Sequence, residues 1–191
     1  MEQERSRLSP TEWIAVGLGS GLLGGVALVA PVVVWDWRHT GHLAFELPMA
    51  ATAWLFGLRH FSHTHYLAWP LVVGIALLAA YVILSGIAFT GLADRAYRVA
   101  RPLTSLAAGF AWGFVSFIFF WDMLLPIARG GAPFRATAGA PGLFVAPTWV
   151  WILGFTLLGL TIGACYAALR TPARGEERER PAAPSPLQRA A

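Results

Sequence analysis

Four apolar stretches in the chain are each long enough to cross a lipid bilayer as an α-helix, which takes about 20 residues. They cover residues 13–35, 66–92, 102–126 and 148–169. The chain of 191 residues is 57% hydrophobic and only 13% charged, whereas a soluble domain is about 45–50% apolar and about 25% charged. These features argue strongly against a soluble globular domain. They predict an all-α, polytopic membrane protein with a four-helix transmembrane bundle.

The placement of arginine predicts the orientation of these spans, because cytoplasmic segments of membrane proteins are enriched in Lys and Arg. All 14 Lys and Arg residues are arginine, and ten of them lie before the first span, between the second and third, or after the fourth. Both termini are therefore predicted to be cytoplasmic, as in a bacterial inner-membrane protein. Residues 1–12 would form the N-terminus, 13–170 the transmembrane domain, and 171–191 a charged, disordered tail.

Aromatic residues support this orientation, since Trp and Tyr gather at membrane interfaces. The inner belt is predicted to contain Trp13, Tyr97 and Tyr166. The outer belt is predicted to contain Trp35, Trp37, Tyr66, Trp69, Trp121, Trp149 and Trp151.

A further apolar segment, residues 43–58, is short and interrupted by Pro48. As a fifth span it would place Arg5 and Arg7 on the outer side of the membrane, against the positive-inside rule. We therefore expect a helix that lies in the outer interface or that dips into the membrane and returns.

The two halves of the chain share a pattern that predicts a duplicated helical hairpin. Each half has a span, a Trp-Asp pair, a PxxATAxxxG segment (residues 48–57 and 133–142) and a second span. Two copies inserted with the same orientation would be related by an axis along the membrane normal. Coincidence in a chain rich in Ala, Gly and Pro is the alternative.

Glycines four residues apart predict close helix packing, more often inside one chain than across a dimer. They are Gly17, Gly21 and Gly25, then Gly109 and Gly113, then Gly159 and Gly163. With the short Arg-bearing turn and the ending GFTLLGLTIGACYAALR, these spans resemble small, uncharacterised bacterial four-helix inner-membrane proteins. That resemblance implies no activity and no catalytic residues.

All five histidines lie in the first outer connection, where they form a candidate metal site. Imidazole and carboxylate groups suit Zn²⁺ or Cu²⁺. The candidate ligands are His39, His42, Glu46, His60, His63 and His65. Because no standard ligand spacing is matched, we favour the alternative of interfacial histidines that bond to headgroups, water or helix ends.

Two acids, Asp36 and Asp122, follow tryptophans at matched positions in the two halves. If the duplication is real, they could face each other as paired carboxylates. The favoured alternative is that both are structural acids that pair with Arg38 or Arg129. A carboxylate at the end of a span can reach water, so its charge costs little free energy there. Arg95, Arg98 and Arg101 could bind anionic lipid, although an orientation signal explains them more simply.

No GxSxG, HExxH or P-loop pattern occurs, and the single Cys165 excludes an internal disulfide. The sequence therefore favours a non-catalytic subunit or scaffold of a membrane assembly, with other membrane proteins or a second copy as partners and no nucleic acid. An outer-face Cu or Zn protein is the alternative. A small channel or carrier built from the two hairpins comes third, because four spans with no central polar residue argue against a pore in a monomer.

Overall fold

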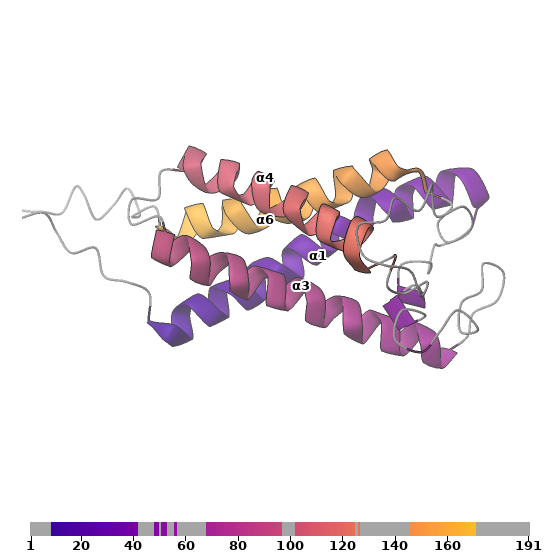
Figure 1. Ribbon diagram of the computed structural model, residues 1–191, viewed down its shortest axis with the longest axis horizontal. Coiled ribbons are helices and arrows are strands. Elements are labelled where there is room, and N and C mark those ends of the chain that lie inside the picture. Colours follow the sequence, from indigo (N-terminus) through magenta and orange to yellow (C-terminus); the bar gives the residue numbers. More distant parts are fainter. Residues whose placement is uncertain are drawn as a thin grey trace, which may run out of the picture.

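The computed structural model describes residues 9–41, 48–49, 51–52, 56, 68–96, 102–124, 126 and 146–170. Within these residues, four helices are long and apolar enough to cross a membrane, and they run side by side in alternating directions (Figure 1). They are α1 (Pro10–Thr40), α3 (Ala68–Ala96), α4 (Pro102–Ile118) and α6 (Thr148–Arg170). The predicted all-α transmembrane bundle is confirmed, so the chain is an integral membrane protein.

The two ends of the bundle carry different residues. At the arginine end, α1 and α4 begin and α3 ends beside Arg95. At the tryptophan end, α1 passes Trp35 and α6 begins beside Trp149.

Helix α1 extends beyond the predicted span at both ends because local signals define its boundaries. The Ser9 hydroxyl accepts a hydrogen bond from the Glu12 amide at 3.3 Å, and the Glu12 carboxylate accepts one from the Ser9 amide at 2.8 Å. This capping box satisfies amides that a helix start leaves unpaired. At the other end Gly41 adopts a left-handed φ of 71° and donates to the Trp37 carbonyl at 3.2 Å, which is a common helix stop.

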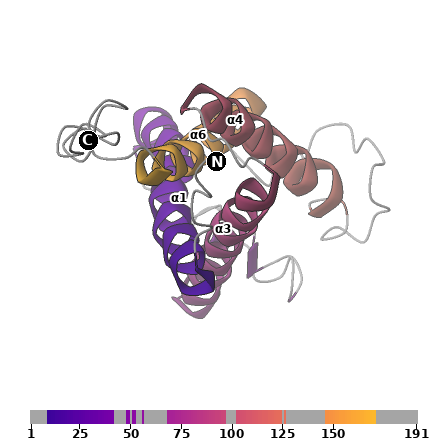
Figure 2. The same cartoon turned by 90° about the vertical axis from the view of Figure 1, so that its left-hand side faces the viewer.

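The helices pack in the order α3, α1, α6, α4, seen end-on in Figure 2. The pairs α1–α3, α1–α6 and α4–α6 share large interfaces, whereas α3 and α4 touch much less. A two-fold axis that exchanged α1 with α4 and α3 with α6 would make the α1–α6 and α3–α4 interfaces equal. The packing lacks this equality, so the duplicated hairpin stays a prediction from the sequence.

Glycine brings α1 and α3 into backbone contact. A Cβ on Gly17 would lie 2.5 Å from the Cα of Ile87, and a Cβ on Gly86 would collide with the Gly17 carbonyl oxygen. Gly21 faces the Val82 carbonyl in the same way. No side chain fits at these positions, so the predicted internal packing role of the α1 glycines is confirmed.

The α4–α6 pair uses glycine on both helices. A Cβ on Gly159 would collide with the Gly109 carbonyl and lie 2.8 Å from the Cα of Gly113, and one on Gly163 would lie 2.5 Å from the Ser105 carbonyl. Small residues on both sides let the two backbones approach closely. The predicted role of these glycines within one chain is likewise confirmed.

The bundle is filled by aromatic side chains, two of which the belt prediction placed wrongly. Trp151 is 0% exposed and Tyr166 is 1% exposed, so both belong to the core. The Trp151 indole donates to the Ala146 carbonyl at 3.3 Å, which satisfies its N–H without water. Trp37, Trp69 and Trp149 are exposed at the tryptophan end, as expected for an interfacial belt.

Part of the apolar segment 43–58 packs against the start of α3. Pro48, Met49 and Thr52 are buried there, and the Thr52 hydroxyl donates to the carbonyls of Pro48 and Pro70. A Cβ on Gly74 would collide with the Pro48 carbonyl. The choice between an interfacial helix, a re-entrant helix and a fifth span depends on residues outside the described ranges.

Candidate functional site

Asp36 is the buried acid of the tryptophan end, with 1% of its surface exposed. Its depth follows from the register of α1 and α6: a Cβ on Gly24 would lie 2.8 Å from the Leu158 side chain, and one on Gly154 would lie 2.5 Å from the Leu28 carbonyl. Each step forward along α1 is thus one step back along α6. Extended to the end of α1, this antiparallel register places Asp36 level with Ala146, just before α6 begins.

This position sets Asp36 beside the amino end of α6. The amino end of a helix carries a partial positive charge and unpaired amides, which stabilise a nearby anion. Asp36 lies level with the amino end of α6, so we expect its carboxylate to support the α1–α6 contact. The side chain is cut off from water, unlike the expectation for a span end, and its role as a structural acid stays a prediction.

His39 sits one turn after Trp35 and is held by it. The two rings stack with centroids 3.8 Å apart and planes 18° apart. The Nδ1 atom of His39 donates to the Trp35 carbonyl at 2.8 Å, since a carbonyl can only accept. Trp35 is fixed in turn by an edge contact with Trp149 at 5.0 Å. With Nδ1 as the donor, Nε2 is the acceptor nitrogen of the neutral ring.

The remaining predicted metal ligands lie outside the described residues: His42, Glu46, His60, His63 and His65. Among the residues that the structure describes, no group of three His, Cys, Asp or Glu side chains is placed to hold a metal ion. The predicted cluster from His39 to His65 therefore stays a prediction.

Asp122 lies in the π-helical continuation of α4, η2 (Phe119–Leu124). Pro126 accounts for the wider turn, because its ring would clash with the carbonyl of Asp122 in a regular α-helix and it has no N–H to donate. Stacking of Trp121 on Phe117, with centroids 5.5 Å apart, fixes this segment. Asp122 is half-buried at the tryptophan end, and its pairing with Asp36 stays a prediction.

A polar seam links α3 to α4 in the middle of the bundle. The Trp112 indole donates to the Ser85 hydroxyl at 2.8 Å, and the hydroxyls of Tyr81 and Ser116 are hydrogen-bonded. The expectation that the spans carry no central polar residue is therefore wrong. The sequence does carry a signal for this seam, which is the spacing of its residues. Tyr81 and Ser85 on α3 are four residues apart, as are Trp112 and Ser116 on α4, so each pair shares one helix face.

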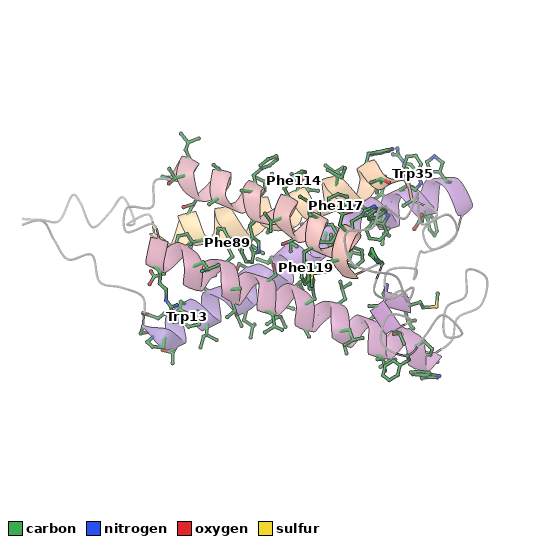
Figure 3. All side chains as sticks on the ribbon, viewed as in Figure 1. Trp13, Trp35, Phe89, Phe114, Phe117 and Phe119 are labelled. Carbon is green, nitrogen blue, oxygen red and sulfur yellow. The ribbon has the colours of Figure 1, made fainter. Side chains whose placement is uncertain are left out.

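The outward face of α4 is aromatic. On the four long helices and the continuation of α4, the exposed phenylalanines are Phe110, Phe114 and Phe119, all on α4 or its continuation; Phe56, in the segment before α3, is exposed as well. Phe114 is 48% exposed, whereas Phe117, three residues on, is 8% exposed and faces the core (both are labelled in Figure 3). The outward apolar residues in the middle of α1, α3 and α6 are aliphatic.

No family model matches the chain, and no curated protein or solved structure matches it either. The resemblance to small bacterial four-helix inner-membrane proteins therefore stays a prediction from the sequence.

Proposed function

We propose that this integral membrane protein is a non-catalytic subunit or scaffold of a membrane assembly, and that α4 docks a transmembrane helix of a partner protein. The aromatic outward face of α4 carries this proposal. Phe110 and Phe114 are one helical turn apart and both are about half exposed, so they offer one stripe to a neighbouring helix.

The chemistry of a bilayer explains why aromatic residues matter here. Lipid tails are as apolar as leucine, so helices associate through close packing and not through the hydrophobic effect. Rings that pack on rings gain about 0.5–1.5 kcal/mol beyond the area they bury. A stripe of phenylalanine on one helix therefore favours a protein neighbour over acyl chains.

The described polar groups inside the bundle support a non-catalytic role. Ser85 and Trp112 bond to each other across the seam. The Thr90 hydroxyl donates to the Gly86 carbonyl at 2.7 Å, within its own helix. The hydrogen bonds of these groups stabilise the bundle.

Photo-crosslinking in the native membrane tests the docking proposal. We expect a benzophenone amino acid at Phe114 to give a discrete adduct with one other membrane protein. The same probe at Leu84, which is 65% exposed on α3, should give only lipid adducts. The identified partner should also co-purify with the wild-type chain and be lost from a Phe110→Ala/Phe114→Ala variant.

Two results would contradict this assignment. Lipid adducts alone at both positions would make α4 an ordinary lipid-facing helix. An adduct of twice the mass of the chain would show that a second copy occupies the face. The unfolding midpoint of each substituted protein shows whether it is folded, so that neither result is attributed to misfolding.

We also infer that the arginine end faces the cytoplasm of a bacterial cell, in the inner membrane. Support comes from the bias of the arginines toward this end and from the exposed tryptophans at the other. Reporter fusions to both termini test the inference. Activity of a periplasmic reporter at either terminus would reverse it.

A second candidate function, metal binding at the tryptophan end, is favoured by the bond from His39 to the Trp35 carbonyl. Metal-binding histidines commonly donate their other ring N–H to a carbonyl, which orients the ligand nitrogen. Metal content of untagged protein tests it beside His39→Ala and His60→Ala/His63→Ala/His65→Ala. About one Zn or Cu per chain, lost in the variants, is the supporting result; no metal in the wild type removes this candidate.

A further inference from the structure

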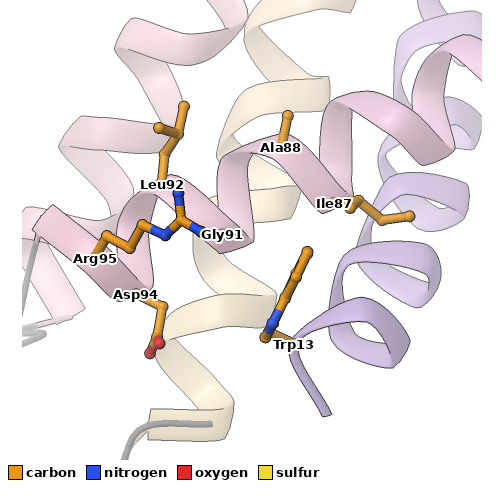
Figure 4. A pocket seen from close by; sticks show the side chains of 7 residues that line it. All are labelled: Trp13, Ile87, Ala88, Gly91, Leu92, Asp94 and Arg95. Carbon is orange, nitrogen blue, oxygen red and sulfur yellow. The ribbon is translucent and has the colours of Figure 1, made fainter. Parts of the chain in front are cut away.

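A cavity of about 600 Å³ opens at the arginine end, between the start of α1 and the end of α3. Its volume falls within the range of about 300–1,000 Å³ that is usual for pockets that bind organic ligands, and it far exceeds the volume of a single ion. Figure 4 shows the residues that line it: Trp13, Ile87, Ala88, Gly91, Leu92, Asp94 and Arg95.

The cavity is polar at its mouth and apolar inside. Asp94 and Arg95 lie in the last turns of α3, where the helix reaches the membrane surface. Ile87 lies earlier on the same helix, about 12 Å deeper at about 1.5 Å per residue. The Trp13 ring forms the α1 side, 3.5 Å from where a Gly91 Cβ would be. This gradient matches an amphiphile that stands with its head at the surface.

The two charges at the mouth decide which headgroup fits. Arg95 runs back along α3 toward Gly91 and Leu92, and the Asp94 side chain points away from the Arg95 guanidinium (Figure 4), although both residues line the cavity. A guanidinium binds phosphate through its fork of N–H donors. A carboxylate repels an anionic head, but it has acceptor sites for several donors, so it can receive an ammonium besides its contacts within the protein.

We propose that this cavity binds a phospholipid whose headgroup joins a phosphate to a primary ammonium, as in phosphatidylethanolamine. The phosphate lies at Arg95, the ammonium lies at Asp94, and an acyl chain extends past Leu92 toward Ile87. The Trp13 ring covers the glycerol region. This lipid site is separate from the proposed docking face, because the cavity lies between α1 and α3 and the docking face lies on α4.

Native mass spectrometry of delipidated protein tests the site with three lipids of identical acyl chains: phosphatidylethanolamine, phosphatidylglycerol and phosphatidylcholine. We expect one phosphatidylethanolamine per chain to bind about tenfold more tightly than the other two, as one charge-assisted contact allows. Inorganic phosphate should not displace it. Asp94→Asn should abolish the preference over phosphatidylcholine, and Arg95→Gln should weaken all three lipids.

A matched pair of substitutions separates this cavity from the general lipid surface. Ala88→Phe fills the cavity from its wall and should abolish the tight site. Ala80→Phe makes the same change at an exposed position of α3 outside the cavity, and it should bind like the wild type. Unfolding midpoints confirm that each variant is folded.

Three outcomes would overturn the proposal. Tighter binding of phosphatidylglycerol than phosphatidylethanolamine would assign an anionic-lipid site. Displacement by inorganic phosphate would reduce the site to an anion contact. Wild-type binding by a folded Ala88→Phe would place the lipid elsewhere. If Ala88→Phe does not fold, wild-type binding by both Asp94→Asn and Arg95→Gln overturns the proposal instead.

Discussion

Trp112 of α4 donates its indole N–H to the hydroxyl of Ser85 of α3, at 2.8 Å. The bond spans the one neighbouring pair of helices in the described bundle that has little backbone contact. Tyr81 and Ser116 form a second rung one helical turn away. Side chains, and not glycine packing, therefore close the bundle on this side.

Breaking that bond should destabilise the bundle measurably. Ser85→Ala leaves the indole N–H of the half-buried Trp112 without this acceptor, so we expect a loss of about 1 kcal/mol in the free energy of unfolding. The double variant Ser85→Ala/Trp112→Phe should lose less than the sum of the single losses, because no donor is then left unpaired. Titration with a denaturing detergent measures both, and strict additivity would show that the bond contributes nothing.

Glycine substitutions should separate contact positions from neutral ones. Gly159→Ala places a methyl group against the Gly109 carbonyl, and overpacking of this kind costs about 1–3 kcal/mol. Gly19→Ala is the matched control, since no atom lies within 4 Å of its added Cβ. It should be neutral or stabilise α1 by up to about 1 kcal/mol. Equal effects at the two sites would contradict the packing described for α4 and α6.

The two acids of the tryptophan end should respond differently to loss of charge. Asp36→Asn should lower the free energy of unfolding by about 1–2 kcal/mol, because the amino end of α6 favours a carboxylate beside it over a neutral amide. Asp122→Asn should change it little, since Asp122 is half-buried. Stabilisation by either substitution at neutral pH would instead reveal two carboxylates that repel each other.

Thr52 should anchor its segment to α3 through its hydroxyl. Thr52→Val keeps the shape of the side chain but loses the bond to the Pro70 carbonyl, so we expect a loss of about 1 kcal/mol. Thr52→Ser retains the hydroxyl and should lose less. If both variants unfold at the same midpoint, the hydroxyl is not the anchor.

The sequence by itself determined the four spans and the glycines that join them. Length and apolarity are enough to predict a membrane helix, because a bilayer leaves the backbone no partner outside its own helix. The spacing of Gly109 and Gly113, or of Gly159 and Gly163, predicts close packing wherever such helices meet. Both predictions depend only on residues within one segment.

Only the tertiary structure decided which faces are buried and which helices are neighbours. Hydropathy cannot separate a core residue such as Trp151 from an interfacial one such as Trp149, because lipid and protein interior are both apolar. The bond between Ser85 and Trp112 joins residues on different helices, and no local pattern pairs them. The order α3, α1, α6, α4, the buried Asp36 and the cavity beside Trp13 follow from those long-range contacts.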